Sequence, residues 1–141
     1  MLKNLPLPMH RNAMAAALAV QAANRQGKAW PMYEKLFANQ TALGRENLER
    51  YAGEIGLDID KFKADLDDPK LKDEVNADLR GAQAAGINGT PTFLVNGQPV
   101  TGARPFDDFA KVIDDELGKA EALLKQGVPL AEIYEKRAKS K

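Results

Sequence analysis

The side chains that most often carry catalysis or bind metals are scarce in this sequence. It contains no cysteine and a single histidine, His10. Without cysteine there is no disulfide, no thiolate nucleophile and no thiolate metal ligand, and one histidine excludes a multi-histidine metal site. Histidine can act as an acid or base near neutral pH, but no carboxylate or nucleophile is spaced around His10 as in a catalytic triad. We therefore expect a structural role for His10.

Two further patterns suggest a calcium site and a phosphate site, but neither has the residues that such a site requires. Five acidic residues gather in the middle of the chain: Glu46, Glu49, Glu54, Asp58 and Asp60. They lack the glycine and the terminal glutamate of a calcium loop, so we expect a solvated face. The glycines of GINGTPTF, residues 86–93, lead into a strand pattern and not into a helix that could bind phosphate. We expect neither a cofactor nor a metal.

The most distinctive short stretch is GINGTPTFLVNG, residues 86–97. A polar turn runs through Thr90 and Pro91 directly into an apolar strand. Asn96-Gly97 then separates two strand-like runs, which is the strongest signal for a two-residue β-hairpin. Pro99 confines the second strand to the edge or end of a sheet, because proline cannot donate a ladder hydrogen bond.

Composition and charge limit the class of protein and the kinds of partner that the sequence allows. The chain has 141 residues, 44% of them apolar, which suits one globular domain with a hydrophobic core. Twenty basic residues balance twenty acidic ones, which argues against electrostatic binding to nucleic acid. No apolar run approaches the length of a membrane span, so we expect no membrane partner. The run AMAAALAV, residues 13–20, favours an alanine-rich helix over a secretory signal, because it continues without a break into a helical pattern.

Periodicity predicts a helical block before the hairpin and helices after it. Apolar residues recur at helical spacing over about residues 12–26, 30–38, 44–58, 59–66 and 69–85. Asp58 or Asp60 is expected to cap the fourth of these helices, and Pro69 to begin the fifth. A helix follows Pro105, with one face of Phe106, Phe109, Ile113, Leu117 and Ala120. We expect a single domain over residues 1–141, made of a helical block (12–85), the hairpin and last core helix (86–126) and a tail helix (127–141).

Methionine and aromatic residues form a second stripe near the N-terminus. These are Met9, Met14, Trp30, Met32 and Tyr33. Met-rich surfaces adapt to varied peptides, but a stripe at helical spacing is more often part of a core. We expect core positions.

Three segments in this order resemble the DsbA family of thioredoxin-fold thiol–disulfide oxidoreductases. They are LPLPMHRNAMAAALAVQAANRQGKAWPMYEKLFANQ (5–40), ENLERYAGEIGLDIDKFKADL (46–66) and GINGTPTFLVNGQPVTGARPFDDFAKVID (86–114). The resemblance covers about residues 2–117. It implies an α/β class, as an incomplete thioredoxin-like fold that is mostly helical with one terminal β-hairpin.

The resemblance also implies roles for two residues. Pro91 matches the family's cis-proline, and Thr90 matches the residue before it. In the family this pair faces the active-site cysteines, and the backbone at the Thr90 position can pair with an extended substrate peptide. Thr90 and Pro91 are therefore the candidate peptide-binding residues, and an extended peptide or protein substrate is the candidate partner. The resemblance implies no catalytic residue in this chain.

The sequence differs from the family in lacking the segment that carries the cysteines, and this difference determines which chemistry is possible. The family's first core strand and its Cys-x-x-Cys helix would lie before Met1, so the resemblance implies a truncated fold. Thiol exchange requires a thiolate, and the chain has none, so we expect it to be redox-inactive by itself. Without the first core strand the hairpin would have an open edge, which predicts a homo-oligomer formed through that edge.

Three interpretations of the function stay open at this point. The chain is the C-terminal part of a thiol–disulfide oxidoreductase, or a cysteine-less module for binding or self-association, or a purely structural helical domain. Whether it is part of an enzyme is left open. The family is mostly periplasmic or exported, but this sequence shows no convincing signal, so the compartment is undetermined.

Overall fold

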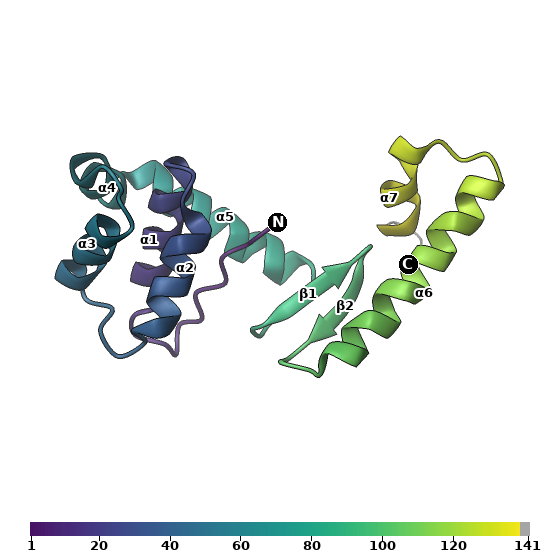
Figure 1. The fold of residues 1–141 in the computed structure, drawn as a ribbon, viewed down its shortest axis with the longest axis horizontal. Coiled ribbons are helices and arrows are strands. Elements are labelled where there is room, and N and C mark those ends of the chain that lie inside the picture. The colour runs from purple at the N-terminus through teal and green to yellow at the C-terminus, as the bar shows by residue number, and fades with distance from the viewer. Residues whose placement is uncertain (139–141) are drawn as a thin grey trace. The chain divides into compact units, whose positions relative to one another are not determined.

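The structure, a computed structural model, describes residues 1–138 (Figure 1). Seven helices and one hairpin follow each other along this part of the chain: α1 (Ala13–Arg25), α2 (Ala29–Ala38), α3 (Arg45–Glu54), α4 (Ile59–Leu66), α5 (Pro69–Ala84), β1 (Thr92–Val95), β2 (Gln98–Thr101), α6 (Phe106–Lys125) and α7 (Leu130–Ala138). The helical block, the hairpin and both later helices therefore lie where periodicity predicts them. Residues 139–141 of the predicted tail helix lie outside the described residues.

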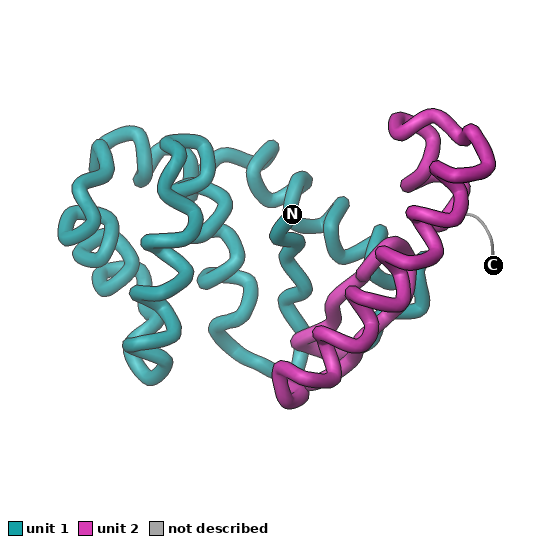
Figure 2. The backbone as a smooth tube through the Cα atoms, turned by 45° about the vertical axis from the view of Figure 1, so that its right-hand side comes forward, with its two compact units in different colours: residues 1–88 teal, residues 89–141 magenta. Residues whose placement is uncertain are grey.

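The chain divides into two compact units, residues 1–88 and residues from 89 onward (Figure 2). Unit 1 contains α1 to α5 and the N-terminal arm. Unit 2 contains the hairpin, α6 and α7. The expectation of a single domain stays a prediction, and the two units are described separately below.

Helix α1 is the centre of unit 1 because its side chains are small. Ala19, Ala22 and Ala23 are fully buried, and α2, α3, α4 and α5 all contact this helix. Alanine lets neighbouring helices approach closely and is also the best helix former. Larger side chains of the surrounding helices complete the core: Met32, Leu36, Leu48, Tyr51, Phe62 and Leu71. The buried Tyr51 hydroxyl donates to the carbonyl of Ala42 at 3.0 Å, so it is satisfied.

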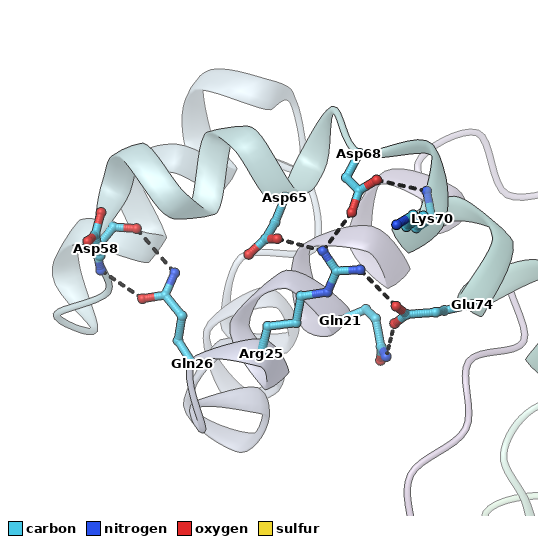
Figure 3. A network of polar contacts seen from close by, with 8 residues as sticks. All are labelled: Gln21, Arg25, Gln26, Asp58, Asp65, Asp68, Lys70 and Glu74. Carbon is cyan, nitrogen blue, oxygen red and sulfur yellow. Dashed lines mark hydrogen bonds and ion pairs between the residues drawn. The ribbon is translucent and has the colours of Figure 1, made fainter.

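A polar network at the end of α1 fastens this helix to α4 and α5 (Figure 3). The Arg25 guanidinium donates to Asp65 at 2.6 Å, to Asp68 at 2.9 Å and to Glu74 at 2.7 Å. The hydrogen bond to Glu74, followed by those to Asp68 and Asp65, raises the pKa of Arg25 above its ordinary value. A planar guanidinium can satisfy three carboxylates at once, so Arg25 holds three helices together through one side chain.

Side chains close the helix ends as the sequence predicts. Asp58, and not Asp60, caps α4 by accepting a hydrogen bond from the Lys61 N–H at 3.1 Å. Pro69 occupies the first turn of α5. At the end of α3, Gly56 has a φ of 72°, and Lys28 Nζ donates to its carbonyl at 2.9 Å. These contacts satisfy backbone groups that helix ends leave free.

The core positions expected for the methionine and aromatic stripe were wrong for Trp30 and Met9. On α2, Met32 and Leu36 are buried, but Trp30 is 60% exposed, and Met9 in the arm is also exposed. Met32 and Leu36 are four residues apart and share the face toward α1, whereas Trp30 belongs to a neighbouring stripe on which its ring packs edge-on to Tyr33. On α6, Phe106, Ile113 and Leu117 are exposed as well.

Unit 2 consists of the hairpin, α6 along it and α7 folded back on α6 (Figure 1). Val100 of β2 and Ile133 of α7 are its buried apolar residues. Asn96 and Gly97 both have positive φ, as a tight hairpin turn requires. The turn therefore confirms the Asn-Gly signal, and it sets the register that positions the candidate site.

Candidate functional site

Thr90 and Pro91, the two residues expected to contact a peptide, lie at the start of unit 2, directly before β1. Both are exposed, and the peptide bond between them is cis. The Thr92 hydroxyl donates to the Gly89 carbonyl at 2.8 Å and closes the turn in front of the strand. The Gly102 N–H donates to the Pro91 carbonyl at 2.8 Å, so the ladder between the strands extends one pair beyond β1 and β2.

The register decides which backbone groups of β1 face outward. Thr92 lies opposite Thr101, Phe93 opposite Val100, and Leu94 opposite Pro99. In an antiparallel pair, residues alternate between those that exchange hydrogen bonds and those that do not. Because Pro91 and Gly102 form a bonded pair, Phe93 and Val100 form the next one. The N–H and C=O groups of Thr92 and Leu94 therefore point away from β2.

The open edge of β1 continues into the loop at Thr90. Among residues 1–138, neither the N–H nor the C=O of Thr90 has a hydrogen-bond partner, and β1 has no neighbouring strand besides β2. The unpaired groups of Thr90 thus precede the outward-facing groups of Thr92 and Leu94 along the chain. We call the unpaired backbone groups of these three residues the open edge.

The opposite edge of the hairpin is blocked. Pro99 occupies a non-bonded position of β2, so its missing N–H is one that would have faced outward. At the end of the same strand, Arg104 Nε donates to the Thr101 carbonyl at 3.0 Å and occupies a second outward group. Proline and charged side chains are common protections of exposed edges. A further strand is therefore accommodated at β1 and not at β2.

No side chain at the open edge is placed for acid–base or nucleophilic chemistry. The Thr90 hydroxyl has no partner within the described residues, and Phe93 of β1 packs its ring against that of Phe109, with the ring centroids 4.8 Å apart. Residues 1–138 contain no group of three or more potential metal ligands. This arrangement can bind an extended chain through its backbone, but it holds no catalytic group of its own.

Two other candidates from the sequence lie elsewhere, in unit 1. His10 is exposed in the turn before α1, where its backbone N–H donates to the Leu7 carbonyl at 3.0 Å. Trp30 lines an open cleft of about 320 Å³ together with Leu2 and Val20. Met32 is buried and does not line this cleft, so the five Met and aromatic residues do not form one groove.

Sequence reasoning missed the outward groups of Thr92 and Leu94 and one buried ion pair. The sequence did carry a signal for the outward groups of Thr92 and Leu94. Pro99, two residues after the turn, cannot donate a ladder hydrogen bond, so it indicates which positions of the hairpin do not exchange hydrogen bonds between the strands. The second is Glu116, which is 1% exposed and accepts hydrogen bonds from Arg137 Nε at 3.0 Å and Nη2 at 2.8 Å. Glu116 stands among exposed acidic residues in the sequence, so no pattern marks it as buried.

Comparison with known proteins shows the family to which the chain belongs. The sequence matches the DSBA-like thioredoxin domain over residues 4–114, which is most of the chain. The chain belongs to this family. The match confirms the predicted fold class, since the described elements are mostly helical with one antiparallel hairpin. With no cysteine, this family member has no thiol of its own for disulfide exchange.

Curated relatives that match this chain are longer proteins. The chain is 45% identical over 97 residues to a Na(+)/H(+) antiporter NhaA of Herminiimonas arsenicoxydans, covering 69% of this chain and 16% of the relative. It is 39% identical over 97 residues to NhaA 3 of Salinispora tropica, covering 68% of this chain and 15% of the relative. The chain therefore spans about a sixth of the length of these relatives. No solved structure matches it.

Helix length and hydropathy bear on membrane insertion. Within residues 1–138, no helix is both long enough and apolar enough to cross a membrane.

Proposed function

We propose that this chain is a redox-inactive, DsbA-like peptide-binding domain that captures extended polypeptide by strand addition at the open edge. Thr90 and Pro91 would form the first part of the site, and β1 would continue it. The chain contributes recognition in this proposal, and any thiol chemistry belongs to other polypeptide. The single observation that carries the proposal is the set of unpaired backbone groups at Thr90, Thr92 and Leu94, of which those of Thr92 and Leu94 face away from β2.

Backbone groups on a strand edge favour this kind of ligand. An added strand gains main-chain hydrogen bonds that do not depend on its sequence, and pockets for alternate side chains supply selectivity. Phe93 is 45% exposed and faces Phe109, so one such apolar contact surface lies next to the edge. We therefore expect modest selectivity for segments with apolar residues at alternate positions.

A second candidate uses the same edge for self-association. The edge of one copy can serve as the added strand of another, which would make the chain a cysteine-less homo-oligomer. The observation that favours it is that Leu94, on this edge, is 54% exposed. Long, apolar, unprotected edges are templates for pairing with further chains.

The names of the curated relatives describe sodium–proton antiporters. The matched region is about a sixth of those proteins, so the present proposal concerns only the domain that they share with this chain. We propose that the shared domain binds polypeptide there as well.

Substitution by proline tests the proposal with a built-in control. Leu94→Pro removes an outward N–H from the open edge, and Thr101→Pro removes an outward N–H from the blocked edge of β2. Both positions are non-bonded, so neither change removes a hydrogen bond between the strands. Binding is measured by fluorescence anisotropy with labelled ten-residue peptides from an unfolded, carboxymethylated polypeptide.

We expect Leu94→Pro to weaken peptide binding by about tenfold, the size of one lost hydrogen bond at a desolvated edge, and Thr101→Pro to leave it unchanged. Equal loss in both variants, or no loss in either, would contradict the proposal. Sedimentation equilibrium of the same proteins examines the second candidate. A wild-type dimer that becomes monomeric in Leu94→Pro would favour self-association over peptide capture.

A further inference from the structure

The sequence contains two Asn-Gly dipeptides, Asn88-Gly89 and Asn96-Gly97. In such a dipeptide the backbone nitrogen of glycine can attack the side-chain carbonyl carbon of asparagine, because glycine has no Cβ to obstruct the approach. The residues before the two asparagines, Ile87 and Val95, are both β-branched. Local sequence therefore does not distinguish the two dipeptides, and a difference in their reactivity has to come from the fold.

The hairpin turn holds Asn96-Gly97 in one conformation. Asn96 has a φ of 47° and Gly97 a φ of 85°, and the pair Val95 and Gln98 closes the turn. A Cβ placed on Gly97 would lie 3.0 Å from the Cα of Ala138, so this glycine is also packed. Attack on the asparagine side chain requires rotation of the backbone, and here that rotation would open the hairpin. We therefore expect Asn96 to react slowly in the folded chain.

Asn88-Gly89 is free of these constraints. Neither residue belongs to a helix or strand, and Asn88 is exposed. Within residues 1–138 the Gly89 N–H has no hydrogen-bond partner, and a Cβ placed on Gly89 would meet no atom within 4 Å. The Asn88 side chain donates a long hydrogen bond, 3.3 Å, to the carbonyl of Gly86. Turning this side chain toward the Gly89 nitrogen therefore disrupts no packed element.

The position of this dipeptide in the chain adds to its freedom. Unit 1 ends at residue 88 and unit 2 begins at residue 89 (Figure 2). Segments that join compact units are exposed and open locally at lower free energy than the elements that they connect. Helix α5 ends at Ala84 and β1 begins at Thr92. The backbone between them can adopt the reactive conformation while both elements stay folded.

We propose that Asn88 is a site of spontaneous deamidation, which the fold permits there and prevents at Asn96. The Gly89 nitrogen forms a bond to Asn88 Cγ and gives up its proton, and Asn88 Nδ2 leaves as ammonia. Water then opens the resulting five-membered succinimide. Opening at the side-chain carbonyl gives aspartate, and opening at the backbone carbonyl gives isoaspartate. The overall reaction consumes water and releases ammonia, and it requires no oxidant or reductant.

The reaction changes the charge of a segment that otherwise has none. Residues 81–103 contain no Asp, Glu, Lys or Arg. Either product carries a carboxylate, which is ionised at neutral pH and stands two residues before Thr90. The formal net charge of the chain falls from zero to minus one, and isoaspartate also lengthens the backbone. This inference rests on the local backbone of the two dipeptides and is independent of peptide capture at the open edge.

Mass spectrometry of the full chain during incubation at pH 7.4 and 37 °C tests the proposal. Each deamidation raises the mass by about 1 Da, and electron-transfer fragmentation assigns it to one asparagine and separates isoaspartate from aspartate. In the folded chain we expect Asn88 to react at least about tenfold faster than Asn96. In 6 M guanidinium chloride we expect similar rates at both positions, because the hairpin turn is lost.

Gly89→Ala is the matched variant. Gly89 does not have a positive φ and has open space around it, so alanine fits without strain. The added Cβ obstructs the attacking nitrogen. We expect deamidation at Asn88 to slow by about tenfold or more, with the rate at Asn96 unchanged. Circular dichroism confirms that the variant and the wild type fold alike.

Four results would overturn the proposal. They are equal rates at the two asparagines in the folded chain, a faster reaction at Asn96, a Gly89→Ala variant in which Asn88 reacts as fast as in the wild type, and a preference for Asn88 that persists unchanged in denaturant. The last result would place the preference in the local sequence and not in the fold. Reaction of both asparagines in denaturant and of neither in the folded chain would overturn it as well, since the fold would then protect Asn88 too.

Discussion

Glu116 shows how one buried charge is stabilised in unit 2. Its carboxylate is almost completely buried and is surrounded by cations from its own helix and from α7. Desolvation raises the pKa of Glu116, but the hydrogen bonds and charges of Lys119 and Arg137 lower it by more, so the pKa lies below its ordinary value. A two-pronged guanidinium contact of this kind also fixes geometry, so Glu116 positions α7 against α6.

The lowered pKa predicts a pH dependence. A carboxylate whose pKa is depressed by folding contributes stability above its ordinary value, 4.5, and this contribution is lost as the pH falls through the folded pKa. We expect Glu116→Gln to lower the Tm of the chain by a few degrees at pH 7. The difference from wild type should shrink toward zero by about pH 3. Thermal melts followed by circular dichroism at several pH values measure it.

Other carboxylates titrate in both proteins and cancel in the difference between the two melts. A difference in Tm that stays constant from pH 7 to pH 3 would show that Glu116 does not act through its charge.

The sequence located Thr90 and Pro91 directly before β1, while their role in binding peptide stays a proposal. Thr90 and Pro91 stand at a junction between a polar turn and a strand, which a motif can reveal. The free backbone groups of Thr90 could not be predicted, because they depend on what lies beside the loop in space. The burial of Glu116 was equally hidden, since its partner Arg137 is 21 residues away.

At the scale of elements, the predicted helices and the hairpin agree closely with the structure. The apolar residues change from helical spacing to strand-like runs around Asn96-Gly97, and this change identified the hairpin. Residues such as Asp58 and Pro69 marked the starts of helices. The faces of α2 and α6 were predicted less well. Periodicity shows that a stripe is apolar but does not say whether another element covers it. Hence Trp30 was expected in a core and is exposed, and Phe106, Ile113 and Leu117 of the apolar face on α6 are exposed as well.

The hairpin turn and the end of α7 meet at Gly97. This residue has a φ of 85°, and a Cβ placed on it would lie 3.0 Å from the Cα of Ala138. Gly127 has a similar φ of 82°, but a Cβ there would have no neighbour within 4 Å. Substituting Gly127 therefore introduces backbone strain alone, whereas substituting Gly97 introduces the same strain together with a steric contact to Ala138.

We expect Gly127→Ala to cost about 1 kcal/mol from positive φ alone, and Gly97→Ala to cost more, because it also displaces α7. Urea unfolding followed by circular dichroism gives both free energies of unfolding. Equal costs in the two variants would mean that the turn and α7 do not pack as described.

At the scale of the whole molecule, family membership and composition lead to one interpretation. A DsbA-like domain without cysteine has the family fold but no thiol of its own. Sequence resemblance led to the family, because the order of three segments is specific. It did not predict the division into two units, which depends on how the residues of each unit pack among themselves.

Amide hydrogen exchange on addition of peptide is the sharpest test of capture at the open edge, because strand addition predicts an alternating pattern. The N–H groups of Thr92 and Leu94 face away from β2 and that of Thr90 has no partner within residues 1–138, whereas those of Phe93 and Val95 already pair with β2. We expect exchange at Thr90, Thr92 and Leu94 to slow when an extended peptide is bound, with little change at Phe93 and Val95. Peptide binding that leaves exchange at these three amides unchanged would contradict strand addition.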